Sequence, residues 1–321
     1  MFLAVGGAQM PLPGKYMDST ASTSAIEGDT PRGFAFAVAC YTLWGLLPFY
    51  MKAVEHIPAA EVVAHRIIWS LPIAGVTLYA LGRTADVKRA LRSPRTLMMA
   101  ALTASIITIN WGTYVWAIAA GRTIETALGY YINPLVSIVM GAALLGEKLS
   151  RMQMAAAALA TLAVVILAIN AGGVPWVSLV LAFSFAIYGF LRKTLPIGPS
   201  QGFFLEVLIL MLPAIGYVLW LQARGESHFL AAQPGNVALL LGCGPVTAVP
   251  LILYAFGTKL LRYSTIGILQ YIGPTMIFAI AVFVFHEPFG TTDAVAFGLI
   301  WLALVIYSWS MVRGRRALRP A

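Results

Sequence analysis

Long apolar runs, separated by short polar segments, recur along the whole chain. Each run approaches the ~20 residues that an α-helix needs to cross the hydrocarbon core of a bilayer. The runs are continuously apolar, whereas barrel strands are shorter and alternate in polarity. The pattern predicts ten transmembrane helices, at 33–53, 61–81, 96–120, 126–145, 152–170, 176–194, 202–222, 236–258, 264–285 and 291–312. We therefore expect an all-α polytopic membrane protein.

The chain also carries an internal repeat with an offset of about 140 residues. Segment 131–134 (YINP) matches 271–274 (YIGP), and a glutamate follows thirteen residues after each proline, at Glu147 and Glu287. Further matches keep nearly the same offset: Arg122 with Arg262, 71–75 (LPIAG) with 212–216 (LPAIG) and 44–45 (WG) with 188–189 (YG). An ordered series of this kind indicates duplication of one structural unit.

The repeat divides the predicted helices into a first half, 33–170, and a second half, 176–312, with five spans in each. Because five is odd, the second half enters the membrane from the opposite side. The two halves are then inverted repeats related by an axis in the membrane plane, which is the geometry of many alternating-access transporters.

Composition and charge agree with a membrane location. Of the 321 residues, 60% are hydrophobic and 10% are charged, against about 25% charged residues in soluble domains. The ten-span arrangement puts 17 of the 21 Lys and Arg residues on the side of the termini, three on the other side and Arg66 within a span. Basic loops stay in the cytoplasm, so we expect both termini to be cytoplasmic in an inner (cell) membrane protein. This topology explains the net charge of +9 without a nucleic-acid partner.

The two ends of the chain differ in composition from the spans. We expect residues 1–32 to form a disordered cytoplasmic tail, with Met17 as an alternative start, and 313–321 to form a basic cytoplasmic tail. Cys40 and Cys243 lie in separate predicted spans and indicate neither a disulfide framework nor a metal site. No cofactor is expected. The predicted partners are the lipid bilayer and a small-molecule substrate.

Seven short segments carry a resemblance to a known family: 41–48 (YTLWGLLP), 64–70 (AHRIIWS), 110–111 (NW), 128–136 (LGYYINPLV), 146–147 (GE), 182–189 (AFSFAIYG) and 270–275 (QYIGPT). Together they resemble the EamA group of the drug/metabolite transporter superfamily, and within it the RarD-type permeases. The resemblance extends from about Gly33 to Arg313. It implies a ten-helix inner-membrane permease made of two EamA repeats, similar to exporters of amino acids and other small metabolites and driven by secondary means.

Polar side chains within the spans are the candidates for function, because a central Arg, Lys or Asp costs about 2.5–3.5 kcal/mol to insert. His65 and Arg66 lie near the start of the second span. They either face a cavity, where Arg66 would hold an anionic group and His65 would titrate, or Arg66 snorkels to the interface and His65 bonds a helix neighbour. Glu206 is a second candidate for proton coupling, or simply reaches water.

In the third span, Asn110 and Tyr114 share a helix face, as do Trp111 and Tyr114. An amide beside aromatic rings suits an amphipathic solute, but Asn also bonds neighbouring helices. Pro134 and Pro274 each remove a backbone donor and predict either matched hinges or matched packing kinks. Glu147 and Glu287 are expected to cap helix ends or to pair with other side chains there.

We expect one central cavity between the halves, with the fifth and tenth spans at the periphery. Its predicted lining is Trp44, His65, Arg66, Asn110, Trp111, Tyr114, Tyr131, Asn133, Tyr188, Tyr254, Gln270 and Tyr271. The predicted function is secondary transport of a small organic metabolite or drug-like solute by alternating access, ion- or proton-coupled and in the export direction. An uncoupled facilitator or channel is the alternative. An intramembrane enzyme is less favoured, since the metal and nucleophile motifs of such enzymes are missing from the sequence.

Overall fold

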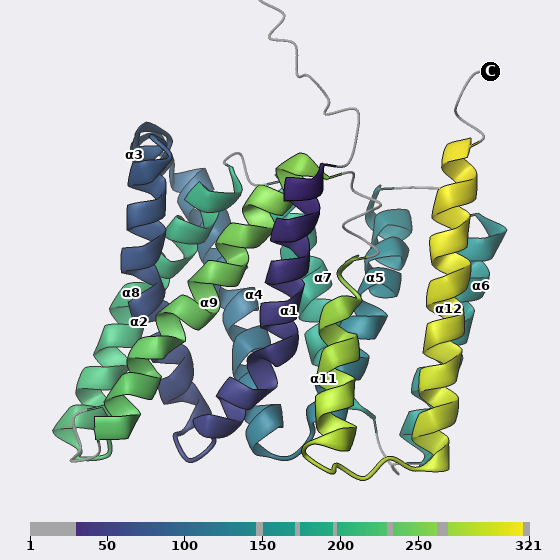
Figure 1. Ribbon diagram of the computed structural model, residues 1–321. Coiled ribbons are helices and arrows are strands. Elements are labelled where there is room, and N and C mark those ends of the chain that lie inside the picture. The colour runs from purple at the N-terminus through teal and green to yellow at the C-terminus, as the bar shows by residue number, and fades with distance from the viewer. Residues whose placement is uncertain are drawn as a thin grey trace, which may run out of the picture.

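The computed structural model describes residues 30–145, 150–170, 174–194, 198–229, 234–261 and 269–316. Within these ranges the chain forms eleven α-helices and no β-strand. Figure 1 shows them as a bundle of roughly parallel and antiparallel helices. The helices are α1 (Pro31–Ala53), α2 (Ala59–Ala80), α3 (Thr84–Leu91), α4 (Pro94–Ala119), α5 (Thr123–Leu145), α6 (Arg151–Asn170), α7 (Trp176–Thr194), α8 (Pro199–Ala223), α9 (Pro234–Leu260), α11 (Ile272–Phe283) and α12 (Thr291–Arg316).

The described helices confirm an all-α membrane protein with several spans. Seven of them, α1, α2, α4, α6, α8, α9 and α12, are long and apolar enough to cross a membrane, while α7 and α11 contain shorter apolar helices. Their outward surfaces are apolar: Leu212 is 81% exposed and Ile169 is 77% exposed. Such a surface suits lipid and would be costly in water.

Each predicted span overlaps a described helix, although the first residues of the ninth span, 264–268, lie outside the described residues. Two of the differences at helix ends concern the expected tails. The α1 helix begins at Pro31, two residues earlier than predicted, because the Thr30 hydroxyl caps it by accepting a hydrogen bond from Gly33 N at 3.1 Å. The expected tail 1–32 is therefore too long at its inner end, and 1–29 lie outside the described residues. At the other end α12 continues to Arg316, into the segment expected to be a tail.

The charged loop after α2 contains a helix that hydropathy did not predict. The α3 helix has Asp86 in its first turn and Lys88 and Arg89 in its last, which suits the helix dipole. Val87 and Ala90 anchor it by packing in a small apolar cluster with residues of α2, α4 and α8.

Pro134 and Pro274 do not occupy matching positions in their helices. Pro134 lies inside α5, where its missing N–H removes a helical hydrogen bond. Pro274 lies in the first turn of α11, where the backbone N–H has no helical partner in any case. The two prolines therefore differ in position within the described helices, and a turn at 270–271 directly precedes the helix that holds Pro274. Their role as hinges or packing kinks stays a prediction. Glu147 and Arg262, the other repeat partners, lie outside the described residues.

Helices far apart in sequence form the main contacts. The α1 helix packs on α9 and α11, α2 packs on α8 and α9, and α7 packs on α4 and α5. The α6 and α12 helices pack on each other at one edge of the bundle (Figure 1), where the fifth and tenth spans were expected. The centre of the bundle is thus built from helices of both predicted halves.

Candidate functional site

Arg66 is buried where α2 meets α4 and α9. Its side chain is only 4% exposed. Its Nε donates to Thr247 Oγ1 on α9 at 2.9 Å, and its guanidinium carbon lies 4.9 Å from the centre of a Trp111 ring on α4. Its Nη1 has no hydrogen-bond partner, and no carboxylate among the described residues forms an ion pair with it. Arg66 therefore does not snorkel out to the interface, and its charge has no partner of opposite sign in the described part of the chain.

Several phenol groups belong to the same part of the helix bundle as this guanidinium. Tyr50, Tyr114 and Tyr130 are close enough to interact with it electrostatically. The Tyr114 and Tyr130 rings are 5.9 Å apart. Tyr114 is 2% exposed, and its hydroxyl has no hydrogen-bond partner. We call Arg66, Trp111, Tyr114, Tyr130 and Thr247 the Arg66 cluster.

Asn110 and Asn133 both bind α7. The Asn110 amide nitrogen donates to Leu181 O at 3.1 Å and to Ser184 Oγ at 2.9 Å, and its oxygen accepts from the Tyr130 hydroxyl at 3.4 Å. The Asn133 amide donates to Ala182 O at 3.0 Å. These contacts suit a role in joining helices. Asn110 also positions Tyr130 of the Arg66 cluster.

His65 bonds a neighbour on its own helix, one of the two alternatives raised by the sequence. Its Nδ1 accepts from Trp69 Nε1 at 3.0 Å, so the ring proton is assigned to Nε2. Nε2 is buried without a partner. The ring lies against Phe229, with centroids 4.8 Å apart.

Glu61 is a functional candidate that the sequence pattern did not reveal. It is fully buried in the first turn of α2 and accepts three hydrogen bonds from the segment after α8: His228 N at 2.8 Å, His228 Nδ1 at 2.7 Å and Ser227 Oγ at 3.3 Å. A pocket of about 610 Å³ lies beside this contact and is lined in part by His228. Glu61 is the first residue of the predicted span 61–81, where a carboxylate is typical of a helix boundary, so the sequence pattern alone gives it no functional signal.

Glu206 does not reach water. It is 2% exposed on α8, and it accepts hydrogen bonds from Thr103 of α4 at 2.8 Å and from Tyr188 of α7 at 3.0 Å. Tyr188, expected in the cavity lining, is therefore a hydrogen-bond donor to this carboxylate.

The remaining predicted lining residues form two other contacts. Trp44 and Tyr254 join α1 to α9, with ring centroids 5.8 Å apart. The Tyr131 hydroxyl bonds Thr275 Oγ1 at 2.7 Å, and its ring lies 6.4 Å from that of Tyr271. Gln270, half-buried, directly precedes Tyr271. The structure thus joins Arg66, Trp111, Tyr114 and Asn110 closely, and places the other predicted lining residues in separate contacts.

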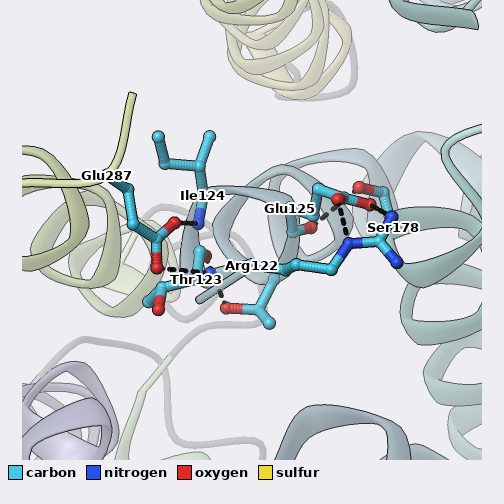
Figure 2. A network of polar contacts seen from close by, with 7 residues as sticks. Arg122, Thr123, Ile124, Glu125, Ser178 and Glu287 are labelled. Atoms are coloured by element: carbon cyan, nitrogen blue, oxygen red, sulfur yellow. Dashed lines mark hydrogen bonds and ion pairs between the residues drawn. The ribbon is translucent and has the colours of Figure 1, made fainter. Parts of the chain in front are cut away.

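Glu287 links the second half to α5 of the first. Its two carboxylate oxygens accept hydrogen bonds from Thr123 N at 2.8 Å and Ile124 N at 2.9 Å (Figure 2). Anionic groups are favoured at helix N-termini, where backbone donors are unpaired. The expected capping role of Glu287 is therefore confirmed. Ser178 of α7 donates to Glu125 O at 2.8 Å and holds the same end of α5.

The described residues contain no group of three or more His, Cys, Asp or Glu side chains that could hold a metal ion. Cys40 and Cys243 are free and buried. Among the described residues, the buried polar groups at these helix contacts include the Arg66 guanidinium, the Glu61 and Glu206 carboxylates, the His65 imidazole and several phenols.

Comparison with known proteins identifies the family. Residues 31–169 match the EamA-like transporter family. The chain is 43% identical over 293 residues to a RarD protein of Streptomyces exfoliatus, covering 91% of this chain and 93% of that one. It is 40% identical to the uncharacterized transporter YojE of Bacillus subtilis, covering 91% and 98%. It is 36% identical to the RarD protein of Escherichia coli K12, covering 89% and 97%.

A solved crystal structure shares the fold at 18% identity, with a TM-score of 0.57 over 89% of this chain and 99% of that one. The high coverage means that the relatives and this chain correspond along nearly their whole length. The chain therefore belongs to the EamA-like transporters, in their RarD group, and is a multi-pass membrane transporter rather than an enzyme.

Proposed function

We propose that this protein is a secondary transporter that moves a small organic solute across the inner membrane by alternating access, coupled to protons and working in the direction of export. The observation that carries the proposal is the burial of Arg66, Glu61 and Glu206 at contacts between helices of the two predicted halves. Ionisable groups are expensive inside a membrane, and they commonly mark substrate and ion pathways.

The helix contacts support two equivalent halves, 33–170 and 176–312. The five long helices of the first half can be paired in order with those of the second: α1 with α7, α2 with α8, α4 with α9, α5 with α11 and α6 with α12. When each helix is replaced by its counterpart, most of the observed helix–helix contacts become other observed contacts. The α1–α9 contact corresponds to α7–α4, α5–α7 to α11–α1, and α2–α9 to α8–α4. The α2–α8, α5–α11 and α6–α12 contacts map onto themselves. A duplicated unit with five spans would produce this pattern as an inverted repeat of ten spans.

The charge distribution and the chain ends support cytoplasmic termini. The N-terminal end of α1 and the C-terminal end of α12 lie on the same face of the bundle (Figure 1). An even number of membrane crossings requires this. Basic residues concentrate on that face under the ten-span arrangement, and such residues remain in the cytoplasm during insertion.

The repeat also supports a pair of coupling residues. His65 lies six residues before segment 71–75, and Glu206 lies six residues before its repeat partner 212–216. Two titratable groups therefore hold equivalent places in α2 and α8. In inverted halves they would sit at opposite depths of the membrane, where each could exchange a proton with one side.

A transport assay on a mixture of solutes tests this function. Purified protein is reconstituted in liposomes loaded with the water-soluble metabolites of a bacterial extract, and the contents are followed by mass spectrometry with and without a pH gradient. We expect a small set of solutes to leave faster than from protein-free liposomes, with rates that rise with the gradient and fall with a protonophore. Gradient-independent flux would favour the uncoupled facilitator, and no protein-dependent flux would contradict the proposal.

A further inference from the structure

We propose that the Arg66 cluster is the substrate's anion site, and that the transported solutes are amphipathic organic monoanions, typically carboxylates. The inference rests on the proposed transport function and specifies the class of solute. It follows from the two buried polar groups of the cluster that lack a partner, and from the aromatic rings beside them.

The charge of the cluster requires a partner that the described protein does not supply. Arg66 is 4% exposed and forms no ion pair with the described carboxylates. Glu61 lies five residues away on α2, but both its oxygens are occupied by the Ser227–His228 segment. A guanidinium remains charged at any physiological pH, so a bound anion would supply the negative charge that the described residues do not.

The donors left unused match a carboxylate. Arg66 Nη1 has no partner while Arg66 Nε is fixed by Thr247, so the side chain is held in place with one donor group unused. The Tyr114 hydroxyl is a second unpartnered group, one turn along α4 from Trp111, whose ring the guanidinium covers. Two donors suit the two oxygens of a carboxylate. A single buried positive charge balances a monoanion, whereas a phosphate dianion would leave one negative charge buried.

The aromatic rings of the cluster favour an apolar body on that anion. Trp111 already lies against the guanidinium at 4.9 Å, and the Tyr114 and Tyr130 rings pack beside each other at 5.9 Å. Aromatic walls with few convergent polar groups are typical of sites for amphipathic organic molecules.

Arg122 provides a matched contrast within the same protein. It also lies over tryptophan rings, 5.7 Å from Trp116 and 5.3 Å from Trp176. However, Arg122 is paired with Glu125 at 2.5 Å and 2.9 Å. A cation over an indole is therefore not unusual here, and what distinguishes Arg66 is the lack of an anionic partner among the described residues.

The test compares two probes of nearly the same shape, phenylacetate and its neutral amide, phenylacetamide. Binding to the purified full-length protein in nanodiscs is measured by tryptophan fluorescence and by thermal unfolding. We expect saturable binding of phenylacetate at least tenfold tighter than that of phenylacetamide. Arg66→Gln should remove this preference, and the control Arg122→Gln should retain it.

Tyr114→Phe keeps the test decisive if Arg66→Gln fails to fold. It removes a hydroxyl that has no partner, so the variant should fold normally and bind phenylacetate several-fold more weakly. Equal binding of the acid and the amide, no binding of either, or unchanged acid binding in both variants would overturn the proposal. These outcomes are independent of the metabolite-loaded liposome assay, because a transporter of neutral solutes would fail here and still pass that assay.

Discussion

At the scale of single residues, buried ionisable groups join the two predicted halves. Arg66 of α2 bonds Thr247 of α9, Glu61 of α2 bonds the segment after α8, and Glu206 of α8 bonds Thr103 of α4. The sequence pointed to Arg66 and Glu206 because charged residues stand out inside apolar runs. It could not reveal Glu61, because the partners that bury it are distant in sequence and only the fold brings them together.

The Glu61 contact predicts a measurable loss of stability. In Glu61→Gln an NH2 group replaces one carboxylate oxygen. That position can no longer accept a hydrogen bond from His228, and the buried contact loses its negative charge. We expect the free energy of unfolding to fall by about 1–3 kcal/mol, the usual cost of disrupting a buried charged hydrogen bond. Thermal unfolding in detergent measures it. Glu226→Gln is the control, since Glu226 pairs with Arg224 at the surface and should change stability by about 0.5 kcal/mol at most.

Asn110 allows a second residue-scale prediction. Its amide donates twice to α7, so Asn110→Ala should lower the free energy of unfolding by about 0.6–2 kcal/mol. The sequence also predicts a higher half-saturation concentration, without loss of protein from the membrane, if Asn110 or Asn133 orients the solute. Measuring stability and transport on the same variants separates the two roles: a stability loss with unchanged half-saturation would leave only the role in joining helices.

At the scale of helices, glycine sets the closest approaches between the halves. A Cβ on Gly244 of α9 would lie 2.3 Å from Trp69 O of α2, and a Cβ on Gly129 of α5 would lie 2.8 Å from Ser178 O of α7. In both cases the obstacle is backbone, which cannot turn aside as a side chain can. Small residues at such contacts are typical of membrane helices that pack without a hydrophobic driving force.

These contacts predict opposite outcomes for glycine substitutions. Gly244→Ala and Gly129→Ala should each destabilise the protein by about 1–3 kcal/mol through overpacking. Gly112→Ala and Gly216→Ala, in helix positions with no other atom near the added Cβ, should be neutral or stabilising by up to about 1 kcal/mol. Thermal unfolding of the four variants provides the comparison. Equal losses in all four would contradict close packing as the cause, because a Cβ on Gly112 or Gly216 meets no other atom within 4 Å.

Hydropathy predicted the long apolar helices well, but it did not predict the short helix α3 or the positions of the prolines within their helices. Continuous apolar runs give the long helices to within a few residues at most ends, because the length needed to cross a bilayer is fixed. It missed α3 because that helix is short and lies in a charged segment, with Val87 and Ala90 as its buried residues. The different positions of Pro134 and Pro274 within their helices could not be predicted either. The repeat indicates which residues correspond, but it does not indicate where each helix begins.

At the scale of the whole molecule, the topology can be tested by labelling. Arg92→Cys lies between α3 and α4 on the predicted cytoplasmic side, and Glu226→Cys lies after α8 on the predicted outer side. Native Cys40 and Cys243 are buried and should contribute little background. In intact cells an impermeant maleimide should label Glu226→Cys and spare Arg92→Cys. The reverse pattern would invert the assignment of the two faces.

The central claim is that one buried site opens alternately to the two sides of the membrane. Ser70 lies one turn from Arg66 on α2 and is fully buried, so a cysteine there reports opening of the site. In oriented proteoliposomes, with Cys40 and Cys243 replaced by alanine, an impermeant thiol reagent is applied from each side separately.

Removing the Glu287 contact should shift the equilibrium between the two open states. Glu287 ties the second half to α5 on the predicted outer face, so Glu287→Ala should favour outward opening. We expect Ser70→Cys to react from both sides in the otherwise unchanged protein. In Glu287→Ala the rate from the outside should rise and the rate from the inside should fall, because both report one equilibrium. A faster outside reaction with no fall on the inside, or reaction from only one side throughout, would contradict alternating access.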